Sequence, residues 1–293
     1  MRVSDSYVFD QANLRLMRSR AESTAATDRI ASGKRVETPW DDSAAAGLIT
    51  RFAQDRARQD AMMTAANRAG EELGVVDGAF DQVLTAVTRA QELAVQLSND
   101  TYSAADRTNA AAEVQQVFQQ VLTSLNLRYG DRYVFGGTAD RAPPFDPAGA
   151  YVGDTGTRRV EIAPGILQDA SIRADVAFKG AGGGIDVLTS LSSFATALSA
   201  NNVTGIRTAI RELADGTQQI TAARSRGGAM MNVFDLAAST ARVNRDDATK
   251  GRSNLEDIDL VDASTRFTAA ERALEASMSA VARSFRLTLL DKL

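Results

Sequence analysis

The feature that most constrains the fold of this chain is an unbroken apolar seam in its first third. Apolar residues follow one another there at alternating steps of four and three: Met62, Ala66, Ala69, Leu73, Val76, Phe80, Val83, Val87, Ala90, Ala94 and Leu97. Such spacing holds one narrow stripe against a partner helix, as in coiled coils. At a rise of about 1.5 Å per residue, a helix over this span is roughly 50 Å long. The seam therefore predicts a helical rod that needs partner helices of similar length.

Two further segments carry seams of the same kind and supply such partners. One follows a polar break at residues 98–104 and comprises Ala111, Val114, Phe118, Val121 and Leu125. The other comprises Ile206, Ile210, Leu213, Thr217, Ile220, Met231, Phe234 and Ala238. Because the break is short, the first two helices should form an antiparallel hairpin, and the three together a bundle. Gly70, Gly74 and Gly78 each cost helix stability and predict a close approach of another helix.

Residues 131–202, between these helices, have a different character. Four of the five prolines lie there, at positions 143, 144, 147 and 164, together with many glycines. The runs RYVF, RRVEIA and SIRADVAF are rich in strand-forming residues and lie between these turn signals. We therefore predict a small β-rich domain inserted into a mainly α-helical chain, with Gly182–Gly184 as its exit joint.

The two ends of the chain carry apolar residues that are too sparse to form a core alone, so we expect them to pair with each other and with neighbouring subunits. The predicted domains are a terminal helical layer of residues 1–45 and 252–293, a rod of residues 46–130 and 203–251, and the insert of residues 131–202. The predicted assembly interface comprises Leu14, Leu16, Met17, Ile30, Trp40, Leu260, Phe267, Leu274, Met278, Val281, Phe285, Leu289 and Leu290.

Composition limits the chemistry open to this chain. It has no Cys and no His, which excludes disulfides, thiolate metal sites, thiol nucleophiles and imidazole bases. Its 33 basic and 37 acidic residues give a net charge of −4, and hence no broad basic surface for nucleic acid. No stretch has the length of a membrane-spanning helix, and the amino end lacks the pattern of a secretory signal. We therefore predict no nucleic-acid partner, no membrane span, no metal and no cofactor.

Three motifs outside the insert occur in a fixed order. The first comprises Ser32, Gly33, Arg35, Asp41, Asp42, Ala44, Ala46 and Gly47. The second places Arg224, Gly228, Ala229 and Asn232 in the returning helix, and the third is SNLEDIDLVDA at residues 253–263, followed by the terminal LTLLDKL. In this combination the chain resembles the flagellin superfamily, the axial proteins of the bacterial flagellum. Pro39 and the run RYVFGGTADRAPPF resemble the branch that joins hook and filament, whereas Val36–Glu37, Trp40 and Lys292 depart from the family pattern.

The resemblance implies a structural protein rather than an enzyme. Its terminal helices would form the coiled-coil inner layer of a ring or helical homo-oligomer. The implied role is a junction adaptor between the hook, with its hook-associated ring, and the flagellin filament. The implied partners are copies of itself, another hook-associated protein on the hook side, flagellin on the filament side and an export chaperone. The implied location is the extracellular flagellum, reached through a dedicated export channel without a cleaved signal. Within the family, the alternative is flagellin, the filament subunit itself.

A further alternative, from another class, is a secreted carboxylate enzyme or glycan-binding protein housed in the insert. Asp140, Asp146, Asp154 and Glu161 are the candidate acid, base or calcium-binding groups. Their spacing lacks the ligand pattern of an EF-hand loop, and Asp occurs frequently in turns. A turn-forming role for these carboxylates is therefore favoured over a catalytic one.

Overall fold

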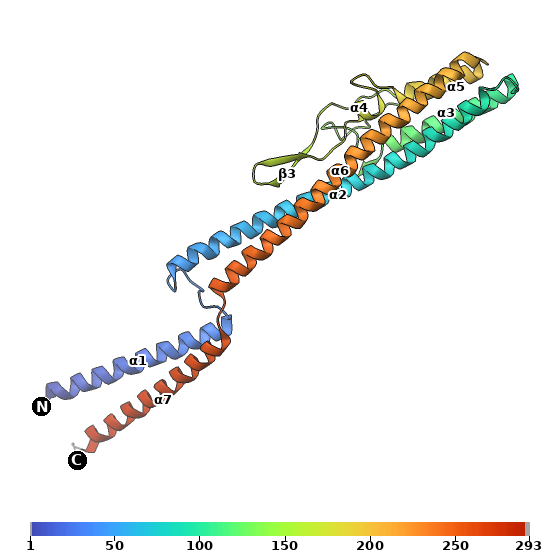
Figure 1. Ribbon diagram of the computed structural model, residues 1–293. Helices are drawn as coiled ribbons and strands as arrows, with labels where there is room; N and C mark the ends of the chain where they lie inside the picture. The colour runs from blue at the N-terminus through green and yellow to red at the C-terminus, as the bar shows by residue number, and fades with distance from the viewer. Residues whose placement is uncertain (1, 291–293) are drawn as a thin grey trace. The chain divides into compact units, whose positions relative to one another are not determined.

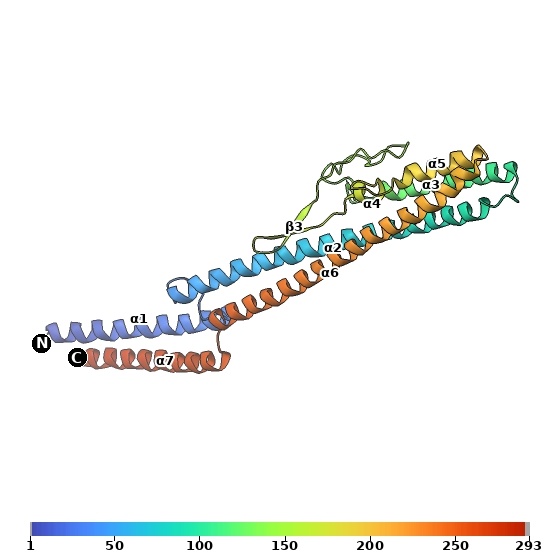
Figure 2. The ribbon, with the colours of Figure 1, turned by 45° about the horizontal axis from the view of Figure 1, so that its top comes forward.

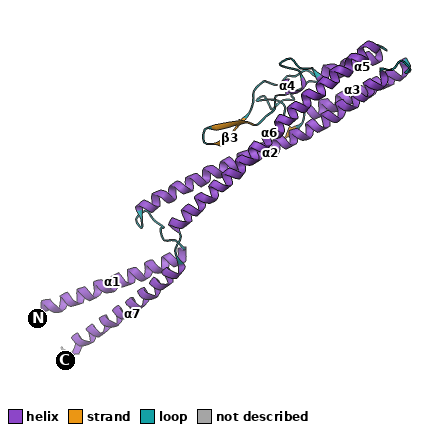
Figure 3. Cartoon of the chain, viewed as in Figure 1, coloured by secondary structure: helices purple, strands orange, loops and turns teal. Residues whose placement is uncertain are grey.

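The computed structural model describes residues 2–290, with side chains described for residue 7 and for residues 10–283. The chain forms two compact units, which we call the terminal unit (Met1–Arg58 and Asn244–Leu293) and the central unit (Gln59–Val243). Long helices dominate both units (Figures 1 and 3). The elements in chain order are α1 (Arg2–Ser32), α2 (Ser43–Leu97), α3 (Ala104–Leu125), β1 (Arg128–Tyr129), β2 (Arg132–Tyr133), β3 (Arg159–Ala163), β4 (Ile166–Asp169), α4 (Ala174–Phe178), α5 (Val187–Ser199), α6 (Val203–Glu256) and α7 (Leu260–Leu290).

The core of the central unit lies between α2, α3, α5 and α6. Every residue of the predicted seam from Met62 to Leu97 is buried, which confirms the helical rod. The α2–α3 hairpin is antiparallel, because Arg89 of α2 pairs with Glu113 at 2.7 Å while Gln82 accepts a hydrogen bond from Ser124 at 3.0 Å. The third predicted seam lies on α6, where five of its residues are buried in the same core, while Ile210 and Met231 are partly buried and pack against it; the buried five are Ile206, Leu213, Ile220, Phe234 and Ala238. The predicted bundle is therefore confirmed.

A buried arginine closes the far end of this bundle. Arg107, near the start of α3, is only 4% exposed. Its guanidinium donates to the carbonyl oxygens of Leu97 at 3.1 Å and Asn99 at 2.9 Å, at the end of α2, and to the side chain of Asn201 in the α5–α6 turn. Since helix carbonyls at a carboxyl end lack partners within the helix, one cation here satisfies several of them at once.

The insert is less strand-rich than the sequence predicts. RYVF and RRVEIA contribute to the antiparallel pairs β1–β2 and β3–β4, the second of which contains a bulge. SIRADVAF instead leads into the short helix α4, and residues 187–199 form α5, which packs along α3 (Figure 2). The apolar residues of α5 lie at helical spacing, and the carboxylate of Asp186 caps it by accepting from the Thr189 N–H. The insert is held to α2 by aromatic packing, in which the rings of Phe80 and Phe178 stack at 5.3 Å.

The glycines of α2 do not mark a close helix approach, so this prediction is wrong. A Cβ atom on Gly74 or Gly78 would meet no atom within 4 Å, and one on Gly70 would meet only the Asp235 carboxylate at 4.0 Å. Gly74 and Gly78 lie off the buried seam, on the solvent side of the helix. Their cost to helix stability is therefore not offset by packing.

Candidate assembly site

The terminal unit is built on one antiparallel pair, α1 against α7, which lie side by side in both views (Figures 1 and 2). The two hydroxyls of Ser19 and Ser277 are 3.1 Å apart across the pair. The least exposed positions form one heptad seam on each helix. On α1 they are Ala12, Leu16, Ser19, Ser23, Ala26 and Ile30, and on α7 they are Ala263, Phe267, Ala270, Leu274, Ser277 and Val281. The spacing of four and three on both helices identifies a two-stranded coiled coil.

This coil is thinly packed. All of its seam residues except Ala263 are only half-buried, and many are Ala or Ser. A two-stranded seam of small residues removes little apolar area from water, and hydrophobic stabilisation scales with that area. The pair alone is therefore a weak coil with exposed sides, in contrast to the fully buried seam of α2.

The predicted interface residues divide into two groups. Leu16, Ile30, Phe267, Leu274 and Val281 lie in the seam between α1 and α7. Leu14, Met17, Leu260, Met278 and Trp40 are instead exposed, Met17 by 64%. Leu14 lies two positions from both Ala12 and Leu16, a rotation of about 200° from each, on the face of α1 opposite the seam, and Met17 lies on the exposed flank between Leu16 and Ser19. The side chains of Phe285, Leu289 and Leu290 lie outside the described residues.

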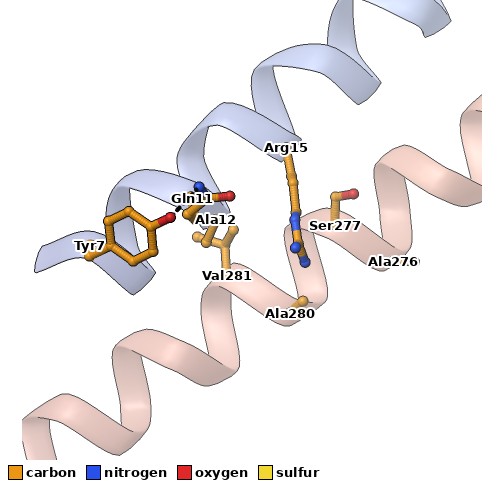
Figure 4. Close-up of a pocket in the computed structure, with 8 residues that line it drawn as sticks. All are labelled: Tyr7, Gln11, Ala12, Arg15, Ala276, Ser277, Ala280 and Val281. Carbon is orange, nitrogen blue, oxygen red and sulfur yellow. Dashed lines mark hydrogen bonds between the residues drawn. The ribbon is translucent and has the colours of Figure 1, made fainter. Parts of the chain in front are cut away.

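A shallow groove runs along one side of the pair. Tyr7, Gln11 and Arg15 of α1 border it, opposite Ala276 and Ala280 of α7 (Figure 4). Gln11 donates a hydrogen bond to the Tyr7 hydroxyl at 3.2 Å. The small residues of α7 leave this side open, so that the groove offers a surface to another helix rather than an enclosed ligand site.

Two segments connect the C-terminal end of α1 to the N-terminal end of α7. The segment after α1 and the segment before α7 form an antiparallel bridge between Lys34 and Asp257. The Arg35 N–H donates to the Glu256 carbonyl at 2.7 Å, and the Ile258 N–H donates to the Gly33 carbonyl at 3.0 Å. Gly33 has a φ of +69°, a left-handed conformation that favours glycine and ends α1. We call the segments Gly33–Val36 and Glu256–Ile258 the joint.

The side chain of Glu256 is the centre of the joint. Glu256 is only 6% exposed, and its carboxylate accepts from Arg252 at 3.1 Å and pairs with Lys34 at 2.8 Å. These two cations, Arg252 first, lower the pKa of Glu256 from 4.5 to about 2. Arg35 adds a hydrogen bond to the Leu255 carbonyl at 2.8 Å and an ion pair with Asp42 at 3.2 Å. One buried anion thus joins two segments that are more than 200 residues apart in the chain.

The joint was not among the predicted site residues, although its signal was present in the sequence. Lys34 lies within the SGKR motif and Glu256 within SNLEDIDL, two motifs singled out above. Neither motif alone reveals that the two pair, because their contact depends on the antiparallel return of α6.

The candidate carboxylates of the insert serve turns. Asp146 accepts from the N–H groups of Ala148 and Ala150, and Asp154 accepts from the Thr138 N–H at 2.7 Å. Glu161 accepts from the Gly165 N–H at 2.8 Å in the β3–β4 hairpin, and Asp140 faces Arg132 at 3.8 Å. Within the described part of the chain, no three acidic side chains gather in a way that holds a metal ion. Each of these carboxylates thus has a local structural partner.

Both terminal regions of the chain match known protein families. Residues 3–140 match the bacterial flagellin N-terminal helical region, and residues 210–291 match the bacterial flagellin C-terminal helical region. Flagellar hook-associated protein 3 of Salmonella typhimurium is 32% identical over 155 residues, 52% of this chain and 49% of the relative. Flagellin of Listeria monocytogenes is 27% identical over 121 residues, 41% of this chain and 42% of the relative. The matched regions thus span about half the length of these curated relatives or less.

The fold has solved counterparts. The structure of flagellar hook associated protein-3 from Legionella pneumophila covers 71% of this chain and 98% of its own, with a TM-score of 0.62 at 13% identity. At this identity, the similarity to the Legionella structure shows a shared fold. The match to the two flagellin regions is a similarity of sequence, and these regions include both helices of the terminal pair and both segments of the joint. The chain therefore belongs to the bacterial flagellin family.

Proposed function

We propose that this protein is a structural adaptor of the bacterial flagellum, joining the hook and its hook-associated ring to the flagellin filament. It acts by association rather than by catalysis, as a ring or helical homo-oligomer. Its partners are further copies of itself, another hook-associated protein on the hook side and flagellin on the filament side. It reaches the extracellular flagellum by a dedicated export route, accompanied in the cell by an export chaperone.

The observation that carries this proposal is the thin packing of the α1–α7 pair and the apolar side chains that it leaves exposed. The α1–α7 coil has a thin, half-buried seam, and it exposes Leu14 and Met17 on its outer face. Exposed apolar rows on a weak coil gain stability when neighbouring copies cover them. The similarity to flagellar hook-associated protein 3 favours the junction role over other assembly roles.

The proposed domains follow from the same argument. Residues 1–45 with 252–293 form the assembly layer, residues 46–130 with 203–251 the rod, and residues 131–202 the outward insert. Among the described residues, no helix is both long and apolar enough to cross a membrane. The absence of His and Cys and the local roles of the insert carboxylates support a structural rather than an enzymatic function.

The alternative is flagellin, supported by the match to flagellin itself. Deletion of the gene in its host separates the two, by microscopy of the cells and assay of protein shed into the medium. A junction adaptor predicts bare hooks with abundant free flagellin outside the cell. Bare hooks without any major filament protein in the medium would identify this chain as the filament subunit. Normal filaments would contradict both.

Truncation of residues 285–293 tests the assembly mechanism. We expect loss of assembly while the insert stays folded, because the insert and its core lie in the central unit. Complementation of the deletion strain gives the assembly result, and hydrogen exchange across residues 131–202 monitors the insert. Filament assembly at the level of the full chain would contradict the role of the terminal helices.

A further inference from the structure

A cavity of about 320 Å³ lies inside the central unit, between the insert and the helix α6. Its walls come from residues 157–177 of the insert and residues 219–230 of α6. Binding pockets for small molecules usually measure about 300–1,000 Å³, so the cavity has room for one small ligand. It lies within one compact unit, and nothing about it depends on the proposed assembly function.

A close contact between the insert and α6 fixes the position of the cavity. Gly227 of α6 is buried, and a Cβ atom there would lie 2.8 Å from the Cδ1 atom of Ile172, so glycine is needed for Ile172 to rest on the helix backbone. Ser171 and Arg226 are the chain neighbours of these two residues, and both line the cavity. A hydroxyl from the insert and a guanidinium from α6 therefore flank the same contact.

The side-chain amide of Gln219 fastens the insert to α6 at the cavity wall. It accepts a hydrogen bond from the Ile185 N–H at 2.8 Å and donates to the carbonyl oxygens of Ala177 and Ile185, each at 3.0 Å. Both hydrogens and the oxygen of this amide are thus engaged. Gln219 therefore serves as part of the wall, and other groups are open to a ligand.

Core residues form the apolar part of the cavity. Ile172, Ala177 and Ala223 are at most 9% exposed, and the partly buried Met230 packs against the same core. Covering an apolar surface of this kind removes it from water and favours a ligand with an organic body.

Most charged groups at the cavity are paired within the chain. Arg173 donates to the Asp175 carboxylate at 3.1 and 2.5 Å, which lowers the pKa of Asp175, and Asp169 accepts from Arg159 at 3.0 Å. No described residue forms a hydrogen bond or an ion pair with Arg226. Because the charges of the two pairs cancel, Arg226 leaves the cavity with one uncompensated positive charge.

Ser171 supplies a second donor. The residue is only 7% exposed, and its side-chain oxygen accepts the Arg158 N–H at 2.9 Å. In the described part of the chain, no group accepts the O–H hydrogen of Ser171. A serine hydroxyl can donate as well as accept, so this buried group keeps a free donor. The unpaired cation and the free donor both favour a negatively charged acceptor.

We propose that this cavity binds a small monocarboxylic acid with an apolar body. A carboxylate carries the single negative charge that balances Arg226, and its two oxygens match the parallel N–H groups of a guanidinium. The Ser171 hydroxyl donates to the same carboxylate, and the apolar body covers Ile172, Ala177 and Ala223. Since these residues come from the insert and from α6, the bound acid holds the two together.

Saturation-transfer NMR on the purified full chain tests the proposal, with benzoate as the probe. We expect a Kd on the order of 1 mM, in keeping with the small size of the ligand. Benzamide has the shape without the charge, whereas acetate and inorganic phosphate have charge without the apolar body. Each should bind about tenfold more weakly or worse. No binding of benzoate, or equally tight binding of any of the three other probes, would overturn the proposal.

Substitutions locate the carboxylate. Arg226→Gln removes the unpaired charge from an exposed position and should weaken benzoate binding about tenfold or more. Ala222→Leu, also exposed, narrows the cavity and should weaken binding as well. The matched control is Arg207→Gln, at an exposed position of α6 away from the cavity lining, and it should leave the Kd unchanged. Circular dichroism verifies that each variant is folded. An equal Kd for Arg226→Gln and the natural chain would contradict the site.

Hydrogen exchange shows independently where the acid binds. With benzoate above its Kd, the amides of residues 169–177 should exchange more slowly, because the ligand stabilises the insert on α6. Arg226→Gln should show no such protection at the same concentration. Protection confined to another part of the chain would mean an adventitious site and would refute the proposed one.

Discussion

The substitution Glu256→Gln should loosen the joint that pins α1 to α7. The change keeps the shape of the side chain but removes the charge that Arg252 and Lys34 surround. Each pH unit by which a pKa falls corresponds to about 1.4 kcal/mol, so the drop from 4.5 to about 2 corresponds to roughly 3 kcal/mol. The side chains of Lys34 and Arg252 are 42% and 34% exposed, and solvent screening reduces this figure to ~1.5–2 kcal/mol.

The sign of the pH dependence follows from the direction of the shift. Because folding lowers the pKa of Glu256, the carboxylate stabilises the joint fully above pH 4.5 and loses that effect as the pH falls toward 2. Glu256→Gln lacks this dependence. The difference between the two proteins should therefore be largest near pH 7 and should vanish near pH 2.

Hydrogen exchange at the Arg35 and Ile258 amides measures the joint directly, since both amides donate across it. We expect exchange in Glu256→Gln to be about 10–30-fold faster at pH 7, the equivalent of the reduced free energy. Glu271→Gln, an exposed substitution on α7, is the matched control and should have no effect. Equal protection in the variant and the natural chain at pH 7, or a difference that persists at pH 2, would refute the role of the buried charge.

Four further substitutions test the central and terminal units. Arg107→Met should lower the free energy of unfolding by about 2–4 kcal/mol, because it leaves buried carbonyl oxygens without a donor. Thermal unfolding followed by circular dichroism measures this, with Arg207→Met, at an exposed position, as the control. Equal melting temperatures of the two variants would contradict the role of Arg107 at the end of the bundle. Gly74→Ala and Gly78→Ala should each stabilise the chain by about 0.5–1 kcal/mol, as urea denaturation can show, because the added methyl group meets open space; destabilisation would mean an unseen close contact. Gly251→Ala should destabilise the terminal unit, because the added Cβ atom would lie 2.7 Å from the Phe52 ring. We expect faster amide hydrogen exchange in the neighbouring residues. Unchanged exchange would show that the ring moves aside at no cost in stability.

Much of the central unit could be predicted because its information is local and periodic. A strict alternation of four and three between Met62 and Leu97 specifies a helix with one buried face, whatever its partner is. The capping box of Ser103 with Asp106 likewise starts α3 in the polar break that separates the first two seams. Strand signals were less reliable. The residues of α5 contain Val, Leu, Thr and Phe, which fit either a strand or a helix, and packing against α3 favours the helix.

The candidate assembly site, too, could be predicted only where its signal is local. The interface list identified both helices of the terminal pair, since their apolar residues recur at helical spacing. It could not separate Leu16 and Phe267, which pack within the pair, from Leu14 and Met17, which face outward. That distinction depends on which side of α1 meets α7, and a sparse stripe does not specify a side. The joint was missed for a related reason, because hydrogen bonds between Gly33–Val36 and Glu256–Ile258 join segments that no local pattern connects.

The sequence by itself determined the three long helices of the central bundle and the family, because helical periodicity and short ordered motifs depend only on neighbouring residues. The tertiary structure alone decided which apolar residues are buried inside the molecule and which stay exposed on its surface. It also decided that Glu256 joins Lys34 and that Trp40 is left exposed. The physical reason is that burial and charge pairing depend on distances in space. These distances are set only when the folded chain brings segments together that are far apart in sequence.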